Sequence, residues 1–164
     1  MGPGMLIKAV LQGSFSLMVF GWAQIVMDVQ PLIVLLSGEG QLHGFSHTFI
    51  GATLLGAFSV ITGKHLAEWG LRMLGISKRD NPVQITWRVT ALSAFLGTYS
   101  HVVLDAIMHS DVEPWYPLSP TNEFLGALRV SQLHELCLYT GIIGGFLYLV
   151  TQLASKHSTR RPRD

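Results

Sequence analysis

The sequence predicts an all-α membrane protein with four transmembrane helices, and three observations support this fold class. Hydrophobic residues make up 49% of the chain and charged residues only 13%, whereas about 25% of residues are charged in a typical soluble domain. Four segments contain the run of about 20 mostly apolar residues that a helix needs to cross a bilayer. No Pro/Ser-rich linker or internal repeat divides the 164 residues, so we expect a single integral membrane domain over residues 1–164.

The predicted spans cover residues 14–36, 47–62, 86–108 and 131–153. The first span follows Lys8 and could also be read as a cleavable signal peptide, but it is too long for one and lacks a small-x-small cleavage site. We therefore interpret it as a retained span. The segment "KHLAEWGLRMLGI", residues 64–76, predicts an amphipathic helix at the membrane interface between spans two and three, and the turn-prone "KRDNP" ends it.

The positions of Lys and Arg predict the orientation of the spans, because cytoplasmic flanks accumulate basic residues. Ten of the 11 basic residues fall before span one, between or beside spans two and three, or after span four, and only Arg129 falls on the other side. Both chain termini should therefore be cytoplasmic. The net charge of +1 and the lack of basic segments interleaved with aromatic residues give no support to a nucleic-acid partner.

With this topology, most of the unusual polar residues lie at the outer ends of the spans. The stretch "TYSHVVLDAIMHSD", residues 98–111, places His101, Asp105 and His109 four residues apart, and residues at this spacing share one face of an α-helix. An ionisable residue in hydrocarbon costs at least about 2.5–3.5 kcal/mol, so such groups usually face a protein interior and find partners there. Other spans and loops bring further polar groups to the same layer: Asp28, His43, His47, Asp111, His134 and Glu135.

These residues have the chemistry and the spacing of a metal site. Imidazole and carboxylate groups four residues apart on a helix can reach a single divalent ion, and other helices can complete its coordination shell. Taken alone, each of these residues is more often a hydrogen-bonded structural group. The combination of His43 with His47, of His101 with His109, and of both pairs with Asp28 and Asp105 at one membrane face favours a shared divalent metal site.

Two segments carry a resemblance to a known family. At "LHGFSHTFIGA" and "SHVVLDAIMHSDVEPWYPLS" the sequence resembles the YdjM-like bacterial inner-membrane proteins, which are catalogued as predicted membrane-bound metal-dependent hydrolases. That family carries a H-x-G-x-[ST]-H-[ST]-type motif and then a S-H-x-x-x-D motif followed by a Trp-Pro-Phe/Leu-like element. The resemblance covers about half of the chain, residues 28–48 and 97–120, and implies a location in the bacterial inner membrane.

The resemblance and the position of the polar residues in one layer together imply roles for individual residues, and the ligand set comes from the resemblance. Metal ligation is implied for His43, His47, His101 and Asp105. Three residues are expected to act in catalysis: Asp28, as a general base or a further ligand, His109 and Asp111. Two more are expected to support the ligands from outside: His134 and Glu135. Zinc suits three or four His and Asp ligands with one open position.

Two positions depart from the family pattern. Gly44 stands where an Arg commonly follows the first motif histidine, and Asp28 is alone where the family has a D-x-D pair. If the missing Arg holds a substrate phosphate in the family, this chain acts on another substrate or is not a catalyst.

The sequence therefore predicts a membrane-bound, metal-dependent hydrolase that acts on a lipid or a membrane-proximal ester or phosphoester. Membrane lipid is the expected partner, and the chain could form a homo-oligomer. Two alternatives use the same polar layer: a carrier or channel for metal ions or protons, and a non-catalytic assembly protein whose polar groups join the helices. The inner halves of the spans are dominated by apolar, Gly and small hydroxyl residues, which favours a one-sided site over a conduit.

Overall fold

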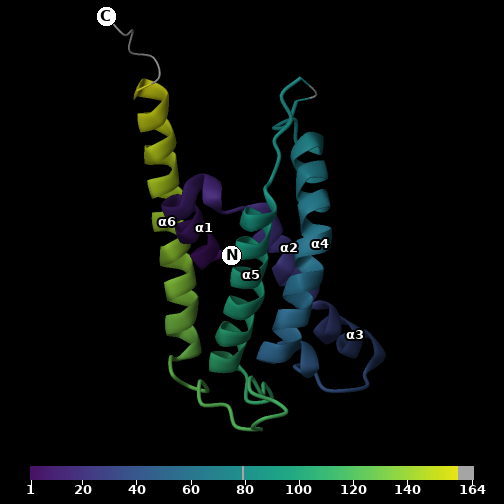
Figure 1. Ribbon diagram of the computed structural model, residues 1–164. Coiled ribbons are helices and arrows are strands. Elements are labelled where there is room, and N and C mark those ends of the chain that lie inside the picture. Colours follow the sequence, from purple (N-terminus) through teal and green to yellow (C-terminus); the bar gives the residue numbers. More distant parts are fainter. Residues whose placement is uncertain (79, 159–164) are drawn as a thin grey trace, which may run out of the picture.

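The computed structural model describes residues 1–78 and 80–158, and it is all-α over these residues (Figure 1). In chain order its elements are α1 (Gly2–Leu11), the 3₁₀ helix η1 (Gln12–Ser14), α2 (Leu17–Met27), α3 (Val29–Ser37), the 3₁₀ helix η2 (Phe45–His47), α4 (Phe49–Met73), α5 (Trp87–Met108) and α6 (Val130–Ser158). The predicted fold class is confirmed.

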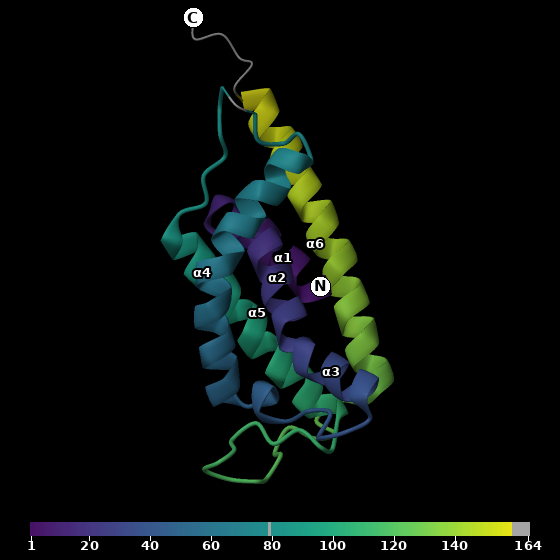
Figure 2. The same cartoon turned by 90° about the vertical axis from the view of Figure 1, so that its right-hand side faces the viewer.

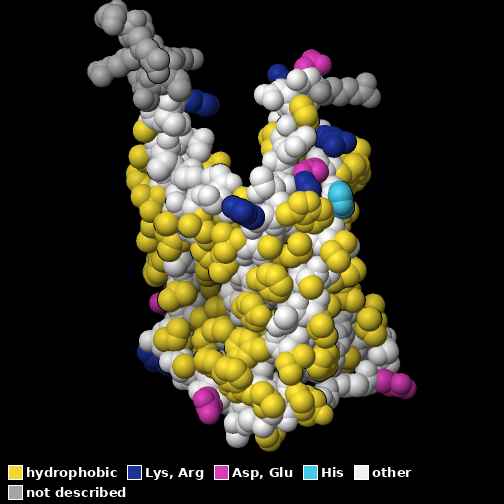
Figure 3. Space-filling model, viewed as in Figure 1, with side chains coloured by type: hydrophobic (Ala, Val, Ile, Leu, Met, Phe, Trp, Pro, Cys, Tyr) yellow, Lys and Arg dark blue, Asp and Glu magenta, His cyan; other side chains and the backbone are white. Residues whose placement is uncertain are grey.

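Four helical segments among the described residues are long and apolar enough to cross a membrane: Leu17–Ser37, Phe49–Met73, Trp87–Met108 and Val130–Lys156. They match the four predicted spans. On the face shown in Figure 3, hydrophobic side chains form a broad band, and most Lys and Arg side chains lie toward the end of the molecule at which α6 ends. Four of the basic residues used to predict the orientation lie outside the described residues: Arg79, Arg160, Arg161 and Arg163.

The first span is divided into two helices at Asp28. α2 ends at Met27 and α3 begins at Val29. Pro31 is the cause, because it has no N–H to donate to the carbonyl of Met27 and its ring crowds that carbonyl. Asp28 keeps nearly helical angles, with φ −78° and ψ −4°, so the chain bends there without reversing. Asp28 thus occupies the joint between two helices.

The predicted separate interfacial helix over residues 64–76 is wrong. α4 begins at the N-cap Thr48, whose side chain accepts a hydrogen bond from the Gly51 N–H at 2.9 Å, and continues unbroken to Met73. The reason lies in packing: Gly63 lies against Trp22 and Ala67 is buried beside Val19, so this face of the segment contacts α2. Residues 64–73 are therefore the last turns of the second span.

Helices α2, α4 and α5 form the core of the bundle (Figure 2). They approach closely through small residues: a Cβ on Gly97 would lie 2.8 Å from the Cβ of Ala23, and a Cβ on Gly56 would lie 2.7 Å from the ring of Phe95. Trp22 Nε1 donates a hydrogen bond to Thr62 Oγ1 at 2.8 Å, which ties α2 to α4. Close backbone approach of this kind is typical of helices that pack in lipid.

Helix α6 packs mainly on α1, an element that the sequence did not predict. A Cβ on Gly144 would lie 2.4 Å from the backbone nitrogen of Leu6, and Gln12 Nε2 donates a hydrogen bond to Thr151 Oγ1 at 3.0 Å. Few contacts join α5 directly to α6. α1 and α6 thus form a pair beside the three-helix core.

Candidate metal centre

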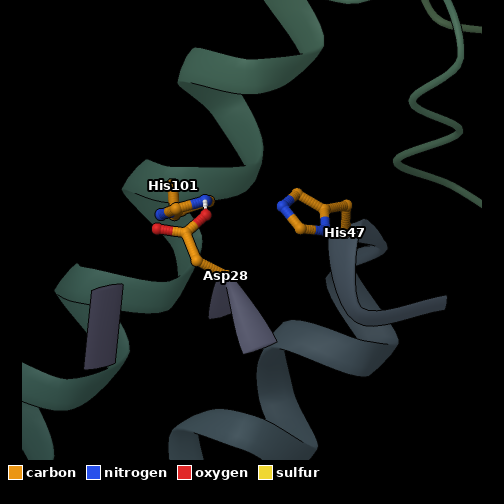
Figure 4. A group of neighbouring side chains, drawn as sticks. All are labelled: Asp28, His47 and His101. Carbon is orange, nitrogen blue, oxygen red and sulfur yellow. Dashed lines mark ion pairs between the residues drawn. The ribbon is translucent and has the colours of Figure 1, made fainter. Parts of the chain in front are cut away.

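Four of the predicted site residues meet at one end of the bundle. Asp28 comes from the joint between α2 and α3, His47 from the end of η2, and His101 and Asp105 from successive turns of α5. Figure 4 shows the side chains of Asp28, His47 and His101 turned toward one another. We call Asp28, His47, His101 and Asp105 the inner group.

The inner group is compact and its imidazoles are buried. His101 Nε2 lies 3.2 Å from Asp28 Oδ1 and 3.0 Å from Asp105 Oδ2. His47 Nε2 lies 3.2 Å from the same Asp105 oxygen. The side chain of His47 is 0% exposed and that of His101 is 9% exposed. One carboxylate oxygen of Asp105 therefore faces both imidazole nitrogens.

A neighbouring glutamine orients His101. Gln24 Nε2 donates a hydrogen bond to the carbonyl of Gly97 at 2.7 Å, so the oxygen of the same amide faces His101. His101 Nδ1 lies 3.0 Å from this Oε1 and must carry the proton, because an amide oxygen only accepts. In neutral His101 the lone pair is then on Nε2, which faces the carboxylates of Asp28 and Asp105. This arrangement is repulsive unless a cation or a proton lies between the groups.

The Nε2 atoms of both histidines in the inner group lack hydrogen bonds to the described residues. His47 Nε2 and His101 Nε2 are both buried and form none, although carboxylate oxygens lie within 3.2 Å. These contacts have the distance but not the alignment of hydrogen bonds. Buried polar atoms are nearly always satisfied, and an ion is one of the recognised explanations when they are not. Two imidazoles and two carboxylates joined by contacts this short are a donor set that fits a divalent metal ion.

Local contacts explain how the chain places His47. Gln30 of α3 accepts a hydrogen bond from the backbone N–H of Ser46 through Oε1 at 2.9 Å, and Ser46 Oγ lies 2.8 Å from His47 Nδ1. A Cβ at Gly44 would lie 2.1 Å from Gln30 Nε2, so glycine at this position lets Gln30 approach. Gln24, Gln30 and Ser46 thus support the site, and sequence reasoning missed all three.

Three further predicted residues form a second cluster, which we call the outer group: His43, His109 and Asp111. His43 Nδ1 lies 3.0 Å from both carboxylate oxygens of Asp111, and the rings of His43 and His109 stack with centroids 4.3 Å apart. Burial raises the pKa of the Asp111 carboxyl, but the hydrogen bond from His43 and its charge lower it by more, so the net pKa lies below its usual value.

The loop after α5 is fastened to the helices on both sides. The backbone N–H of Phe49 donates to the Pro114 carbonyl at 2.9 Å, and the Trp115 ring packs on Phe49 with centroids 4.6 Å apart. Asn122 Nδ2 donates to the carbonyls of Ala106 at 2.8 Å and His109 at 3.2 Å. These contacts hold the outer group over the end of α5.

A polar cavity of about 260 Å³ opens beside the outer group. His43 and Asp111 line it together with Gln41, Gly44, Phe45, Thr48, Glu113 and Tyr116. No Lys or Arg is among these residues. A neighbouring groove of about 200 Å³ is mainly apolar, is lined by residues that include Ile50, Trp115 and Leu118, and shares Tyr116 with the polar cavity.

The structure therefore brings seven of the nine predicted site residues together and leaves two apart. Within the described residues, the inner and outer groups touch through the rings of His43 and His47, whose centroids are 4.9 Å apart. His134 and Glu135 are exposed on α6, and in the part of the chain that the structure describes they form no hydrogen bond or ion pair with the site. α6 packs on α1 and so does not reach the inner group.

The fold and the site define the class of this chain as a helical, membrane-type protein with His and Asp groups that could hold a metal ion. Comparison with protein-family models, with curated proteins and with solved structures finds no match.

Proposed function

We propose that this protein is a membrane-embedded, metal-dependent hydrolase of the YdjM-like type, with its site at the outer face of the bacterial inner membrane. One observation carries the proposal: the buried Nε2 atoms of His47 and His101 converge on Asp105 without hydrogen bonds. A cluster with only a structural role would be expected to give these atoms hydrogen-bond partners, because a buried polar group without one lowers the stability of the fold by about 1–3 kcal/mol.

The inner group would hold the metal ion, which we expect to be zinc. Asp28, His47, His101 and Asp105 supply nitrogen and oxygen donors of the kind zinc binds. A bound ion would polarise a scissile ester or phosphoester and lower the pKa of a water molecule. Gln24 holds the His101 ring in the tautomer that keeps its Nε2 lone pair free, and such supporting contacts typically change metal affinity by about 10- to 100-fold.

Besides a metal ion, hydrolysis needs a place for the substrate and a group that accepts a proton from water, and residues around the polar cavity offer both. The polar cavity lies against the outer group, so a head group bound there is next to the metal centre. Glu113 lines this cavity and takes part in none of the histidine–carboxylate pairs among the described residues. We assign it as the proton acceptor for the attacking water. The sequence contains no Gly-x-Ser-x-Gly nucleophile elbow. Ser46 contacts His47 Nδ1 but is buried, so we expect direct attack by water.

The shape of the surface supports a lipid substrate. Tyr116 lines both the polar cavity and the apolar groove, so a molecule with a polar head and an apolar tail could lie across it. The groove runs along Ile50 and Thr53 at the start of α4, a helix of membrane-spanning length. Because the cavity lining contains no Lys or Arg, the lining itself offers no cationic side chain for a phosphate.

The experiment that tests the proposal measures metal and activity together. We would purify the full chain in lipid nanodiscs without chelator, determine its metal content by mass spectrometry, and assay release of product from p-nitrophenyl esters, bis-p-nitrophenyl phosphate and phospholipid vesicles. His101→Ala with Asp105→Ala should lose the metal and the activity. His65→Ala is the matched control, because His65 lies at the other end of α4, against Trp87.

The possible results separate the functions. Metal and hydrolysis that are both lost in the double variant would support the enzyme. Stoichiometric metal without hydrolysis, combined with uptake of Zn²⁺ into sealed vesicles, would favour a carrier. Failure of the folded wild-type chain to bind Zn²⁺, Mn²⁺ or Fe²⁺ would contradict the proposal and leave the cluster as a joint between helices.

A further inference from the structure

The seven clustered residues contain more donors than one ion can use. A tetrahedral zinc ion takes four ligands, whereas the inner and outer groups together present four imidazoles and three carboxylates. The donor atoms do not converge on a single point. They fall into overlapping triads, each with ligand atoms within 4.8 Å of one another, and the two outermost triads share no residue.

The two outermost triads have the same composition. One contains Asp28, His47 and His101, and the other contains Asp111, His43 and His109. Each therefore offers two imidazoles and one carboxylate of its own. His43 belongs to the outer triad by its closest carboxylate, because its Nδ1 lies 3.0 Å from both oxygens of Asp111.

Asp105 lies between the triads and is the residue that both can share. Its Oδ2 contacts His47 and His101 in the inner group, and a third triad places Asp105 with His43 and His47. A carboxylate has two oxygens that can each bind an ion, whereas a neutral imidazole has one free lone pair. Asp105 is thus the natural bridging ligand.

The polar cavity distinguishes the two positions. Each triad has an exposed carboxylate, since the side chain of Asp28 is 62% exposed and that of Asp111 is 50% exposed. The outer triad lines the polar cavity through His43 and Asp111. A ligand that enters this cavity meets the outer triad first.

We propose that the site holds two divalent metal ions, an inner one on Asp28, His47 and His101 and an outer one on His43, His109 and Asp111, joined by Asp105. The outer ion is the one that faces the substrate. This inference rests on the proposed metal-dependent function and deepens it, since paired ions about 3.5–4 Å apart are suited to phosphoester and ester cleavage.

Metal counting tests the proposal without reference to activity. The full chain in nanodiscs would be stripped with chelator, reloaded with Zn²⁺ and desalted, and the bound zinc would be counted per chain. We expect two equivalents for the wild type and for His134→Ala, a control histidine outside both groups. His109→Ala and Asp111→Asn should each retain one equivalent, and Asp28→Asn should also lose one. Loading with Mn²⁺ should give the electron paramagnetic resonance spectrum of a coupled pair.

The results that would overturn the inference differ from those that would overturn the function. One equivalent in the wild type, unchanged in His109→Ala, would mean a mononuclear inner site and would leave the proposed hydrolase intact. Loss of all zinc in both outer-group variants, each shown to be folded by circular dichroism, would mean that the two groups bind one ion jointly. No zinc in the folded wild type would contradict the metal-dependent function itself. Asp111→Asn keeps the test decisive if His109→Ala does not fold.

Discussion

Replacing Gly51 by Ala should abolish high-affinity metal binding although Gly51 is not a ligand. The residue lies in the first turn of α4, where a Cβ would be 2.0 Å from the carbonyl oxygen of Phe45 and 3.0 Å from the Cα of Ser46. Both are backbone atoms of the segment that carries His47. They cannot rotate away as a flexible side chain would, so the segment itself must move.

The size of the movement follows from the same distance. Cβ atoms essentially never approach another atom closer than 3.0 Å, so the Phe45 carbonyl must retreat by about 1 Å from its present 2.0 Å. Metal–ligand distances are defined to within about 0.2 Å. A shift of His47 on this scale removes it from the inner group, and we expect the affinity for Zn²⁺ to fall at least about 100-fold.

The Gly51→Ala change should raise the intrinsic stability of helix α4 while it lowers the affinity for zinc. Alanine is more favourable than glycine in a helix by about 1 kcal/mol, so lower helix propensity cannot explain a loss of metal. Gly145→Ala in α6 is the matched control, because its Cβ would meet only the Met5 side chain, at 3.9 Å. Competition with a chromophoric zinc chelator would measure both affinities. A Gly51→Ala protein that binds zinc as tightly as the wild type would refute the reasoning.

Three further predictions follow from other contacts. Gln24→Leu should weaken zinc binding by about 10- to 100-fold without loss of fold, because His101 loses the partner that fixes its tautomer; an unchanged affinity in the chelator competition would contradict this. Gly144→Val should separate α1 from α6, because a Cβ at this position would already lie 2.4 Å from the backbone nitrogen of Leu6. Faster proteolysis of α1 would show the separation, and the zinc content should stay constant because this contact lies away from the site. The lowered pKa of Asp111 means that its contact with His43 persists from neutral pH down through the usual carboxyl value of about 3.9 and is lost only below it. Hydrogen exchange of residues 109–129, corrected for intrinsic rates, should therefore stay protected at pH 5, and a loss of protection between pH 7 and 5 would count against that assignment.

Hydropathy was enough to predict the spans but not the way they pack. Each span is a long apolar run, which is a local property of the sequence. The continuity of α4 depends on contacts of Gly63 and Ala67 with α2, and α1 is too short, with glycine and proline in its first turn, to give a pattern of its own. These features arise from contacts between segments that are distant in the sequence, and hydropathy averaged over a local stretch does not report such contacts.

The same distinction applies to the site. Spacing of four residues identified His101 with Asp105, because both lie on α5 and helical geometry relates them directly. His43 and His47 also lie together, with ring centroids 4.9 Å apart, but a turn and a 3₁₀ helix bring them there. Spacing is an indirect guide for such a pair. It could not show that His43 turns toward Asp111, since both lie in loops. Gln24 was missed because a single neutral amide in an apolar helix carries no periodic signal. His134 was placed near the site because the fourth span begins in the same membrane layer, but α6 packs on α1 and has few contacts with α5.

The origin of the inner group in three separate segments of the chain has a consequence for how the protein is assembled. Helices enter a membrane in chain order, so Asp28 and His47 arrive before His101 and Asp105 of α5. An ion could be fully coordinated only after α5 is in place, and from then on it would cross-link the α2–α3 joint, η2 and α5 and add its binding free energy to that of folding. Metal acquisition would thereby mark the assembly of the three-helix core before α6 is added, and a chain arrested before α5 would lack this cross-link.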